Sequence, residues 1–284
     1  MTSDLISAEA VRVAVPDLAA KRAFRAAPRL EILHGVDFRI RTGEAVGIVG
    51  ESGSGKTTLG RALLRLLEPS AGRISFDGQD ITHAPEATLR PLRARMTMIF
   101  QNPLAALNPR RTIAASVAAP LLARGQNDDV RKKVLRALDR AGLAAAYAGR
   151  YPHQLSGGQR QRVGIARAIV TGPEFILADE IVSGLDVSTQ AQILDLLREL
   201  RRDMGLALGF IAHDLSVVRV LCERVVVMHR GRIVEEGSCE ALFAAPQHPY
   251  TRRLLAAIPL PEPDPHWLDA EPEETEAQAG AGLP

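Results

Sequence analysis

A run of nine residues in the first quarter of the chain has the composition and spacing of a phosphate cradle. Residues 50–58 read GESGSGKTT and fit the pattern G-x-x-x-x-G-K-[ST]. Glycine lets backbone N–H groups turn inward without a Cβ clash, and the N-terminus of a following helix favours negative charge. The Lys56 side chain adds a positive charge for β- and γ-phosphates, and the Thr57 hydroxyl can bind Mg²⁺. We therefore expect a nucleotide to be bound by Gly50, Glu51, Ser52, Gly53, Ser54, Gly55, Lys56, Thr57 and Thr58.

Two adjacent acidic residues that follow an apolar segment would complete this chemistry. Residues 175–180 read FILADE, which is typical of a buried strand that ends at a carboxylate. Open α/β sheets bind ligands at the carboxyl ends of their strands. We expect Asp179 to hold Mg²⁺, directly or through water, and Glu180 to act as the general base for the attacking water. A strand followed by two acids is common by itself, and the upstream phosphate loop favours the catalytic interpretation.

A histidine and a glutamine end two further apolar segments. His213 closes an apolar strand-like segment, where its ring can donate a hydrogen bond to a γ-phosphate. Gln101 follows the segment MTMIF, where its amide can reach Mg²⁺ or the attacking water. The plain alternatives are a structural or exposed histidine and an exposed loop amide. In the company of the phosphate loop and the two acids, both residues favour a role at the phosphate.

A second glycine-rich string, LSGGQ at residues 155–159, has no evident role at that same phosphate. Its candidate binding residues are Ser156, Gly157, Gly158 and Gln159. The string makes sense if it closes over a nucleotide held by another copy or by a sister subunit. A chain with both halves of such a split site would sandwich nucleotide and convert ATP binding into movement.

Strand-like and helix-like segments alternate, which indicates an α/β fold with a mostly parallel, covered sheet. The apolar residues 45–49 predict a central strand before the phosphate loop, and residues 56–67 predict the helix after it. Residues 103–173 turn helical, as an insertion between two parts of the sheet. The other expected strands are 11–15, 36–40, 74–76, 96–100, 175–178, 207–212, 225–228 and 232–235, the last two flanking a hairpin turn at 229–231. The other expected helices are 113–123, 130–141, 157–170 and 189–204.

Composition argues against several functional classes. The net charge of +2 gives no electrostatic case for nucleic acid, and no apolar run approaches the ~20 residues of a membrane span. Residues 1–12 lack a basic start and an apolar core, so we expect no signal peptide. Cys222 and Cys239 form no CxxC pair, which argues against disulfide, zinc or iron–sulfur chemistry and fits a reducing cytoplasm. Beyond Pro259 the chain is rich in proline and glutamate, and we expect disorder there.

The ordered set of motifs resembles the nucleotide-binding subunit of ABC transporters over about residues 30 to 240. The set comprises GESGSGKTT, Gln101, LSGGQRQR, ILADE, SGLD at 183–186 and His213. FQNPLAALNPRRT (100–112) and HPYTRRLLAAIP (248–259) are similar to the ATPase subunits of dipeptide, oligopeptide and nickel importers. The resemblance implies a P-loop NTPase with a RecA-like core, an antiparallel β subdomain and an α-helical subdomain inserted at about 103–173. It implies an ATPase domain at 1–245 and a C-terminal extension with a disordered acidic tail at 246–284.

The resemblance also implies roles and partners. The signature residues from Ser156 onward would complete the ATP of the opposing subunit, Asp186 would link the two sites across the dimer, and Gln101 would sense nucleotide. The residues after Gln101 would help form a cleft for a short helix of the permease. The partners would be a second ABC ATPase subunit, like or unlike, two transmembrane permease subunits and an extracytoplasmic substrate-binding protein, at the cytoplasmic face of the membrane. Peptide import leads; nickel import and a soluble non-transport ABC ATPase are the alternatives.

The chain departs from the family pattern at several positions. An aromatic residue often stacks on adenine, but the aligned place holds Val15 and Pro16, with Phe24 as a substitute. Ile181 stands where proline is common, and Gly184 where alanine is common; both flank Glu180 without removing a catalytic group. For the HPY stretch, a helix that packs through Leu254 and Leu255 is the favoured interpretation over a direct substrate or regulatory role.

Overall fold

The computed structural model describes residues 4–16, 28–102 and 107–257. Its larger sheet has six strands in the order β10-β9-β3-β8-β7-β6. Only the β9–β10 pair is antiparallel in this sheet. All residues of β3, β7 and β8 are buried, as expected for parallel strands covered on both faces. The strands are β3 (Ala45–Val49), β6 (Met96–Ile99), β7 (Phe175–Asp179), β8 (Ala207–Ala212), β9 (Arg224–His229) and β10 (Arg232–Ser238).

The smaller sheet is antiparallel, in the order β2-β1-β4-β5. Its strands are β1 (Asp4–Pro16), β2 (Arg29–Arg41), β4 (Ala71–Phe76) and β5 (Gln79–Asp80). The helix α1 (Lys56–Leu63) joins the two sheets, because its Leu59 and Leu63 share one buried cluster with Phe76 of β4 and Ile48 of β3. The start of α1 is thus fixed between two rigid layers.

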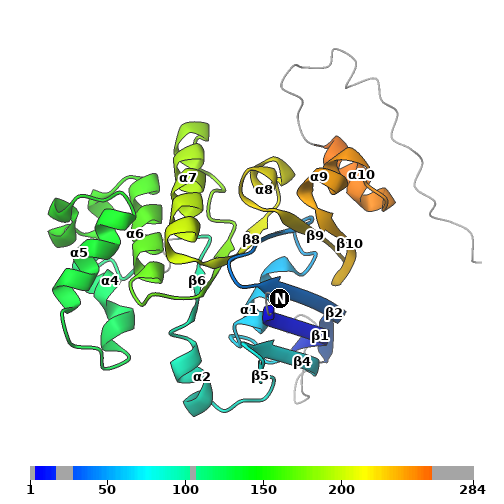
Figure 1. The fold of residues 1–284 in the computed structure, drawn as a ribbon, viewed down its shortest axis with the longest axis horizontal. Coiled ribbons are helices and arrows are strands. Elements are labelled where there is room, and N and C mark those ends of the chain that lie inside the picture. The colour runs from blue at the N-terminus through cyan, green and yellow to red at the C-terminus, as the bar shows by residue number, and fades with distance from the viewer. Residues whose placement is uncertain (1–3, 17–27, 103–106, 258–284) are drawn as a thin grey trace, which may run out of the picture.

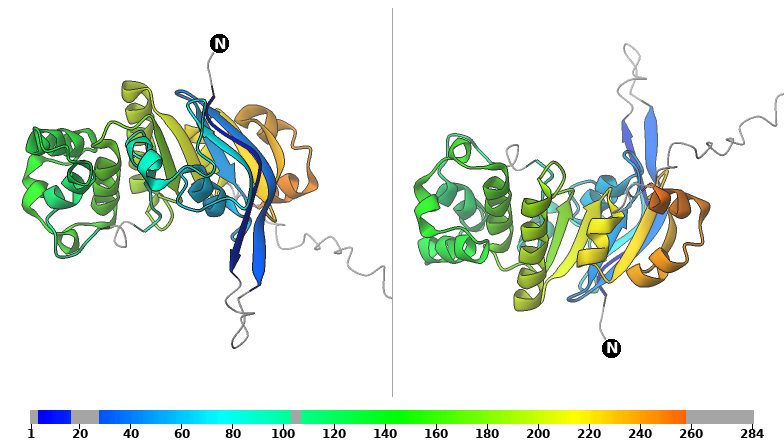
Figure 2. Two further views of the ribbon diagram at one scale, coloured as in Figure 1. Left: turned by 90° about the horizontal axis from the view of Figure 1, so that it is seen from below. Right: turned by 90° about the horizontal axis from the view of Figure 1, so that it is seen from above.

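A group of helices connects β6 to β7. It contains α4 (Ile113–Leu122), α5 (Val130–Arg140), α6 (Gly157–Ile169) and two short 3₁₀ turns at Ala145–Gly149 and Pro152–Gln154. Figures 1 and 2 show this helical group on one side of the larger sheet, with the antiparallel sheet on the other side. The expected fold class, a core with an antiparallel β subdomain and an inserted helical unit, is confirmed. The remaining helices are α2 (Glu86–Leu92), α7 (Val187–Met204), α8 (Leu215–Leu221), α9 (Cys239–Ala244) and α10 (Pro249–Ala256).

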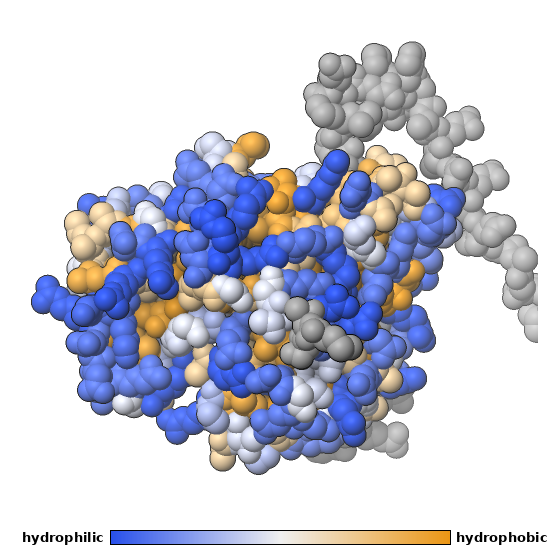
Figure 3. Space-filling model, in the orientation of Figure 1, coloured by the Kyte–Doolittle hydropathy of each residue, from blue (hydrophilic) through white to orange (hydrophobic). Residues whose placement is uncertain are grey.

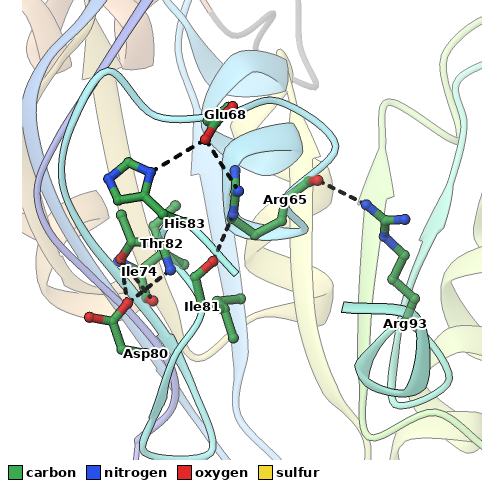
Figure 4. A network of polar contacts seen from close by, with 8 residues as sticks. All are labelled: Arg65, Glu68, Ile74, Asp80, Ile81, Thr82, His83 and Arg93. Atoms are coloured by element: carbon green, nitrogen blue, oxygen red, sulfur yellow. Dashed lines mark hydrogen bonds and ion pairs between the residues drawn. The ribbon is translucent and has the colours of Figure 1, made fainter. Parts of the chain in front are cut away.

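A polar network holds the end of α1 to its neighbours (Figure 4). The buried Arg65 donates through Nε to the carbonyl of Ile81 at 2.8 Å, and Arg93 donates to the carbonyl of Arg65 at 3.1 Å. Nearby, the Thr82 hydroxyl accepts from the backbone N–H of Ile74 at 2.9 Å. The bonds connect the turn after α1 to the segment after β5 and to the turn after α2, and that segment is bonded in turn to β4.

The structure differs from the sequence expectations mainly in the lengths of elements. The helix after the phosphate loop ends at Leu63 rather than at residue 67, and Arg65 takes a left-handed conformation with φ of 51°. The hairpin at 229–231 is confirmed, with positive φ at both Arg230 and Gly231, as a tight two-residue turn requires. The helices α2, α8 and α9 were not expected, since runs of six or seven residues carry little periodic signal.

The surface seen in Figure 3 is mostly hydrophilic, with apolar side chains in small groups. No helix within the described residues is both long and apolar enough to span a bilayer.

Candidate functional site

The phosphate loop (residues 50–58) connects β3 to the N-terminus of α1. Gly50, Gly53 and Gly55 have φ values of 148°, 80° and 105°, in the region that favours glycine. A Cβ at Gly50 would lie 2.2 Å from the carbonyl oxygen of Met228 in β9, so no side chain fits there. The glycine spacing read from the sequence is therefore required by backbone conformation and by the close approach of β9.

Lys56 is the first residue of α1 and is buried, with 4% of its surface exposed. Its ammonium group donates to the carbonyl oxygens of Gly50 at 2.7 Å and Glu51 at 2.8 Å. Burial lowers the pKa of Lys56, and the charges of Glu180 and Asp179 oppose that shift. The ammonium is thus held inside the loop by neutral carbonyls, which leaves its charge available for an anionic ligand.

Thr57 and Asp179 come together as expected. The Thr57 hydroxyl donates to Oδ1 of Asp179 at 3.0 Å, although 122 positions separate them in the sequence. Asp179 is the last residue of β7 and is 5% exposed. Burial raises the pKa of Asp179, the nearby Glu180 adds to that effect, and the Thr57 hydrogen bond opposes it. A buried carboxylate beside a hydroxyl supplies the oxygen donors that suit Mg²⁺.

Glu180 follows Asp179 and forms a polar cluster with Gln101 and His213. The Gln101 amide donates to Oε2 of Glu180 at 2.9 Å, and Nδ1 of His213 lies 3.9 Å from the same oxygen. The His213 side chain is 62% exposed and that of Glu180 is 21% exposed, so the cluster faces solvent. The structure therefore brings together the three residues predicted to act on water and the γ-phosphate.

The backbone of Glu180 is held in an unusual conformation. Its φ of 48° lies in the left-handed region, which costs energy for a residue with a side chain. The Glu180 N–H donates to the carbonyl of Ile211 at 3.0 Å, and its carbonyl accepts from both the N–H and the hydroxyl of Ser183. These bonds hold the backbone from which the carboxylate projects. Ile181 beside it is buried in the larger hydrophobic cluster, the main core.

The second glycine-rich string starts α6, in the helical group. Ser156 caps this helix, since its hydroxyl accepts from the N–H of Gln159 at 3.2 Å and the Gln159 side chain accepts from the N–H of Ser156 at 3.0 Å. Among the described residues, no hydrogen bond or ion pair links Ser156 or Gln159 to the phosphate loop of the same chain. Within one copy, the string is an exposed, capped helix start that is not hydrogen bonded to the phosphate loop.

Asp186 caps α7 close to that helix start. Its carboxylate accepts from the N–H of Thr189 at 2.9 Å and from the hydroxyls of Ser188 and Thr189, each at 2.7 Å. These bonds, led by that from the Thr189 backbone, hold the pKa of Asp186 well below its usual range. The next residue, Val187, is 85% exposed, so an anion and an apolar side chain stand together on the surface.

A hollow of about 250 Å³ lies where the helical group meets the sheet. Phe100, beside Gln101, and Leu66 line it and are 42% and 49% exposed. Arg124 and Arg167 also line it, and burial lowers the pKa of both. The hollow is therefore lined mainly by apolar side chains, with partly buried arginines among them. Residues 103–106, expected to belong to this cleft, lie outside the described residues, as does Phe24.

Sequence reasoning missed one residue of the site. The hydroxyl of Tyr250, in α10, accepts a hydrogen bond from the backbone N–H of Glu51 in the phosphate loop at 2.8 Å. Tyr250 is 2% exposed, and Leu254 and Leu255 pack against the main core as expected. The contact spans 199 positions in the sequence, and no local pattern carries such information.

The fold and this arrangement of loop, acids, glutamine and histidine define an ATP-binding cassette. The sequence profile described as "ABC transporter" matches residues 33–183, and that described as "Oligopeptide/dipeptide transporter, C-terminal region" matches residues 234–282. The chain belongs to the ABC transporter family, as an ATP-hydrolysing cassette.

Relatives agree with this placement. A putative peptide import ATP-binding protein of Brucella ovis is 52% identical over 237 residues, which cover 83% of this chain and 75% of the relative. The glutathione import ATP-binding protein GsiA of Salmonella paratyphi A is 48% identical over 244 residues, 85% of this chain but 39% of that protein. This chain therefore matches less than half of GsiA.

Solved structures show the same fold. A dimeric structure of the ATP-binding cassette MJ0796, in a post-hydrolysis state bound to ADP and Pi, has a TM-score of 0.71 and 30% identity; the match covers 82% of this chain and 98% of that chain. The cbiO1 protein of Clostridium perfringens, part of the ABC transporter complex cbiONQ, has a TM-score of 0.72 and 28% identity over 90% of this chain and 96% of that chain.

Proposed function

We propose that this chain is the ATP-hydrolysing subunit of an importer for peptides, working with a second ATPase subunit and two membrane permease subunits at the cytoplasmic face of the membrane. The oligopeptide/dipeptide C-terminal match and the peptide and glutathione import names of the relatives support the substrate class. The observation that carries the catalytic part is the cluster of Glu180, Gln101 and His213 beside the Thr57–Asp179 pair.

The described contacts support specific roles. Lys56, now bonded to the carbonyls of its own loop, would exchange them for phosphate oxygens, which are stronger acceptors because they are charged. Thr57 and Asp179 would hold Mg²⁺, which neutralises charge on the phosphates when bound. Glu180 would take the proton of the attacking water, Gln101 would orient that water, and the exposed His213 ring would donate to the γ-phosphate.

The exposed helix start at Ser156 supports a dimer in which each ATP lies between two subunits. The capping box already uses the N–H groups of Ser156 and Gln159, and the positive N-terminal end of α6 would still favour a phosphate brought by a facing subunit. A facing subunit would bring Ser156, Gly157 and Gly158 to the ATP held by Lys56. Asp186, on the same edge, would join the two sites. An extracytoplasmic binding protein would deliver the peptide to the permease.

The hollow beside Gln101, which Arg124 and Arg167 help to line, supports docking of a permease segment. A short amphipathic helix fits an exposed apolar hollow, and a carboxylate on it would meet Arg124 and Arg167. Gln101 contacts Glu180, and its neighbour Phe100 lines the hollow. The residue that would meet the permease segment is therefore adjacent in sequence to the residue that contacts the proposed general base. Closure of the ATPase dimer can favour one permease state only through such differential contacts.

The proposal is tested by uptake in vesicles that contain the ATPase and permease subunits with the binding protein. ATP supplied on the side of the membrane where the ATPase lies should drive accumulation of a labelled dipeptide or of glutathione on that side. The variant Glu180→Gln in this chain should abolish this accumulation. ATP hydrolysis that proceeds without any peptide accumulation, with several peptides tried, would contradict the transported class and leave the ATPase assignment standing.

A further inference from the structure

The peptide unit between Gly50 and Glu51 is hydrogen bonded at both of its ends. Its N–H, from Glu51, donates to the hydroxyl of Tyr250 at 2.8 Å. Its carbonyl, from Gly50, accepts from the ammonium group of Lys56 at 2.7 Å. The chain of contacts therefore runs from α10 through one backbone amide to the lysine of the phosphate loop. In such chains each bond polarises the next, so the two bonds support each other.

Glycine makes this peptide depend on an external restraint. Gly50 has a φ of 148° and no Cβ, so its own side chain does not limit rotation of the adjoining peptide. Two contacts restrict it instead: the carbonyl of Met228, which stands against the Gly50 backbone, and the Tyr250 hydroxyl. The first excludes a side chain at position 50, and the second sets which way the N–H points. Because the peptide unit is planar, the direction of the Glu51 N–H also sets the direction of the Gly50 carbonyl, which accepts the hydrogen bond from Lys56.

Tyr250 is itself firmly placed. Its ring stacks on that of His229, at the end of β9, with centroids 4.1 Å apart. Its backbone N–H donates to Nδ1 of His248, the residue that caps α10. Glu235 of β10 accepts from the N–H groups of Gln247 at 2.8 Å and His248 at 3.0 Å, which anchors the start of the helix. The hydroxyl is thus carried by the same β9–β10 hairpin that approaches Gly50.

We propose that Tyr250 is a positioning residue for Lys56, and that it ties the ATP affinity of the phosphate loop to the docking of α10. The inference rests on the proposed phosphate-binding role of Lys56. When a phosphate takes the ammonium group, the Gly50 carbonyl loses its donor and the amide that Tyr250 holds changes its polarisation. Tyr250 therefore both supports the phosphate loop and responds to phosphate binding there.

Tyr250→Phe is the direct test, because it removes the hydroxyl and keeps the ring on His229. The dissociation constant for ATP and the KM should rise about three- to tenfold, the effect of one neutral hydrogen bond, while kcat at saturating ATP stays within about twofold. That split is expected because the bonds and ring contact described for Tyr250 are to Glu51, His248 and His229, and none is to the Glu180 cluster. Unchanged ATP affinity in this variant, or a fall in kcat alone, would overturn the proposal.

A control in the same region separates positioning from general loosening. Ser238→Ala removes the hydroxyl that caps α9, where it accepts from the N–H of Ala241 at 3.1 Å, and it leaves Tyr250 in place. It should lower the melting temperature at least as much as Tyr250→Phe and leave ATP affinity unchanged. An equal loss of ATP affinity in Ser238→Ala would mean that the region of α9 and α10 as a whole, rather than the Tyr250 hydroxyl, sets affinity.

A spectroscopic measurement tests whether Tyr250 responds to phosphate binding in the loop. The chain has three tyrosines, so 3-fluorotyrosine labelling should give three ¹⁹F signals, with that of Tyr250 identified by its loss in Tyr250→Phe. ADP, which fills the loop of a single subunit, should shift the Tyr250 signal and leave the other two in place. A Tyr250 signal that stays fixed while ADP binds would overturn the inference. A wild-type chain that binds no ADP would contradict the proposed phosphate loop itself, and the inference with it.

Discussion

The Gln101 side chain donates a 2.9 Å hydrogen bond to the carboxylate of Glu180, and so joins the ends of two neighbouring parallel strands. Gln101 lies two residues beyond β6 and Glu180 one residue beyond β7. The chain after Gln101 leads into the helical group. Gln101 therefore contacts the side chain proposed as the general base from the start of the segment that connects the sheet to the helical group.

Glu180→Gln is expected to keep ATP binding and to stop turnover. An amide cannot take the proton of the attacking water, so kcat for phosphate release should fall at least about 100-fold. ATP would then remain between the subunits, and the dimer should persist during size-exclusion chromatography with ATP and Mg²⁺. Hydrolysis at the wild-type rate in this variant would remove Glu180 from the role of base.

His213→Ala is expected to lower kcat about 10- to 100-fold with little change in ATP affinity, because the ring would donate to charge that develops at the γ-phosphate. His83→Ala is the matched control, since His83 is also an exposed histidine with a carboxylate near Nδ1, that of Glu68 at 3.3 Å. It should hydrolyse ATP at the wild-type rate. Equal losses in the two variants would assign the effect to surface charge rather than to a phosphate contact.

Gly158→Ala is expected to weaken the contact between α6 and α7. A Cβ at this position would lie 2.6 Å from the Thr189 methyl carbon, so either the Thr189 side chain, which bonds Asp186, or one of the helices must shift, at a cost of about 1–3 kcal/mol in the free energy of unfolding. Urea unfolding would measure it. Thr189→Ser removes that methyl and keeps the hydroxyl that bonds Asp186, so the double variant should recover most of the loss. A double variant no more stable than Gly158→Ala would show that the clash is not the cause.

Leu66→Asp is expected to prevent permease docking. Leu66 lines the hollow and is 49% exposed, and a charge there would oppose burial of an apolar partner segment. Recovery of permease subunits with the tagged ATPase should fall about tenfold. ATP binding by the isolated chain, compared with wild type, would verify folding. Full recovery of the complex would place the docking surface elsewhere.

Local patterns predicted much of this molecule. The alternation of apolar runs with loops located β3, β7 and β8, and the motif spacing located Lys56, Asp179 and Glu180, which the fold does bring together. Such residues can be predicted from the sequence because strand ends and loops are set by local patterns. Their proposed catalytic roles stay predictions for the experiments above.

Other features depended on interactions that a linear pattern does not carry. β1 runs from Asp4 to Pro16, far beyond the expected 11–15. Its pairing with β2 shifts register several times, and Ala10 has a φ of 47°. These irregularities break the two-residue alternation that marks a strand. The hydrogen bond between Glu51 and Tyr250 was likewise not predictable from the sequence, since it depends on how α10 packs against the phosphate loop rather than on the residues of α10 alone.

The buried tyrosine at the start of α10 has a practical consequence for protein engineering. Shortening the protein at residue 245 to isolate its catalytic part would remove the Tyr250 ring that stacks on His229. It would also leave the Glu51 amide without its hydrogen-bond acceptor. Chimeras that exchange C-terminal tails between transporters of different cargo should therefore be joined after Ala256, where α10 ends, and never before it.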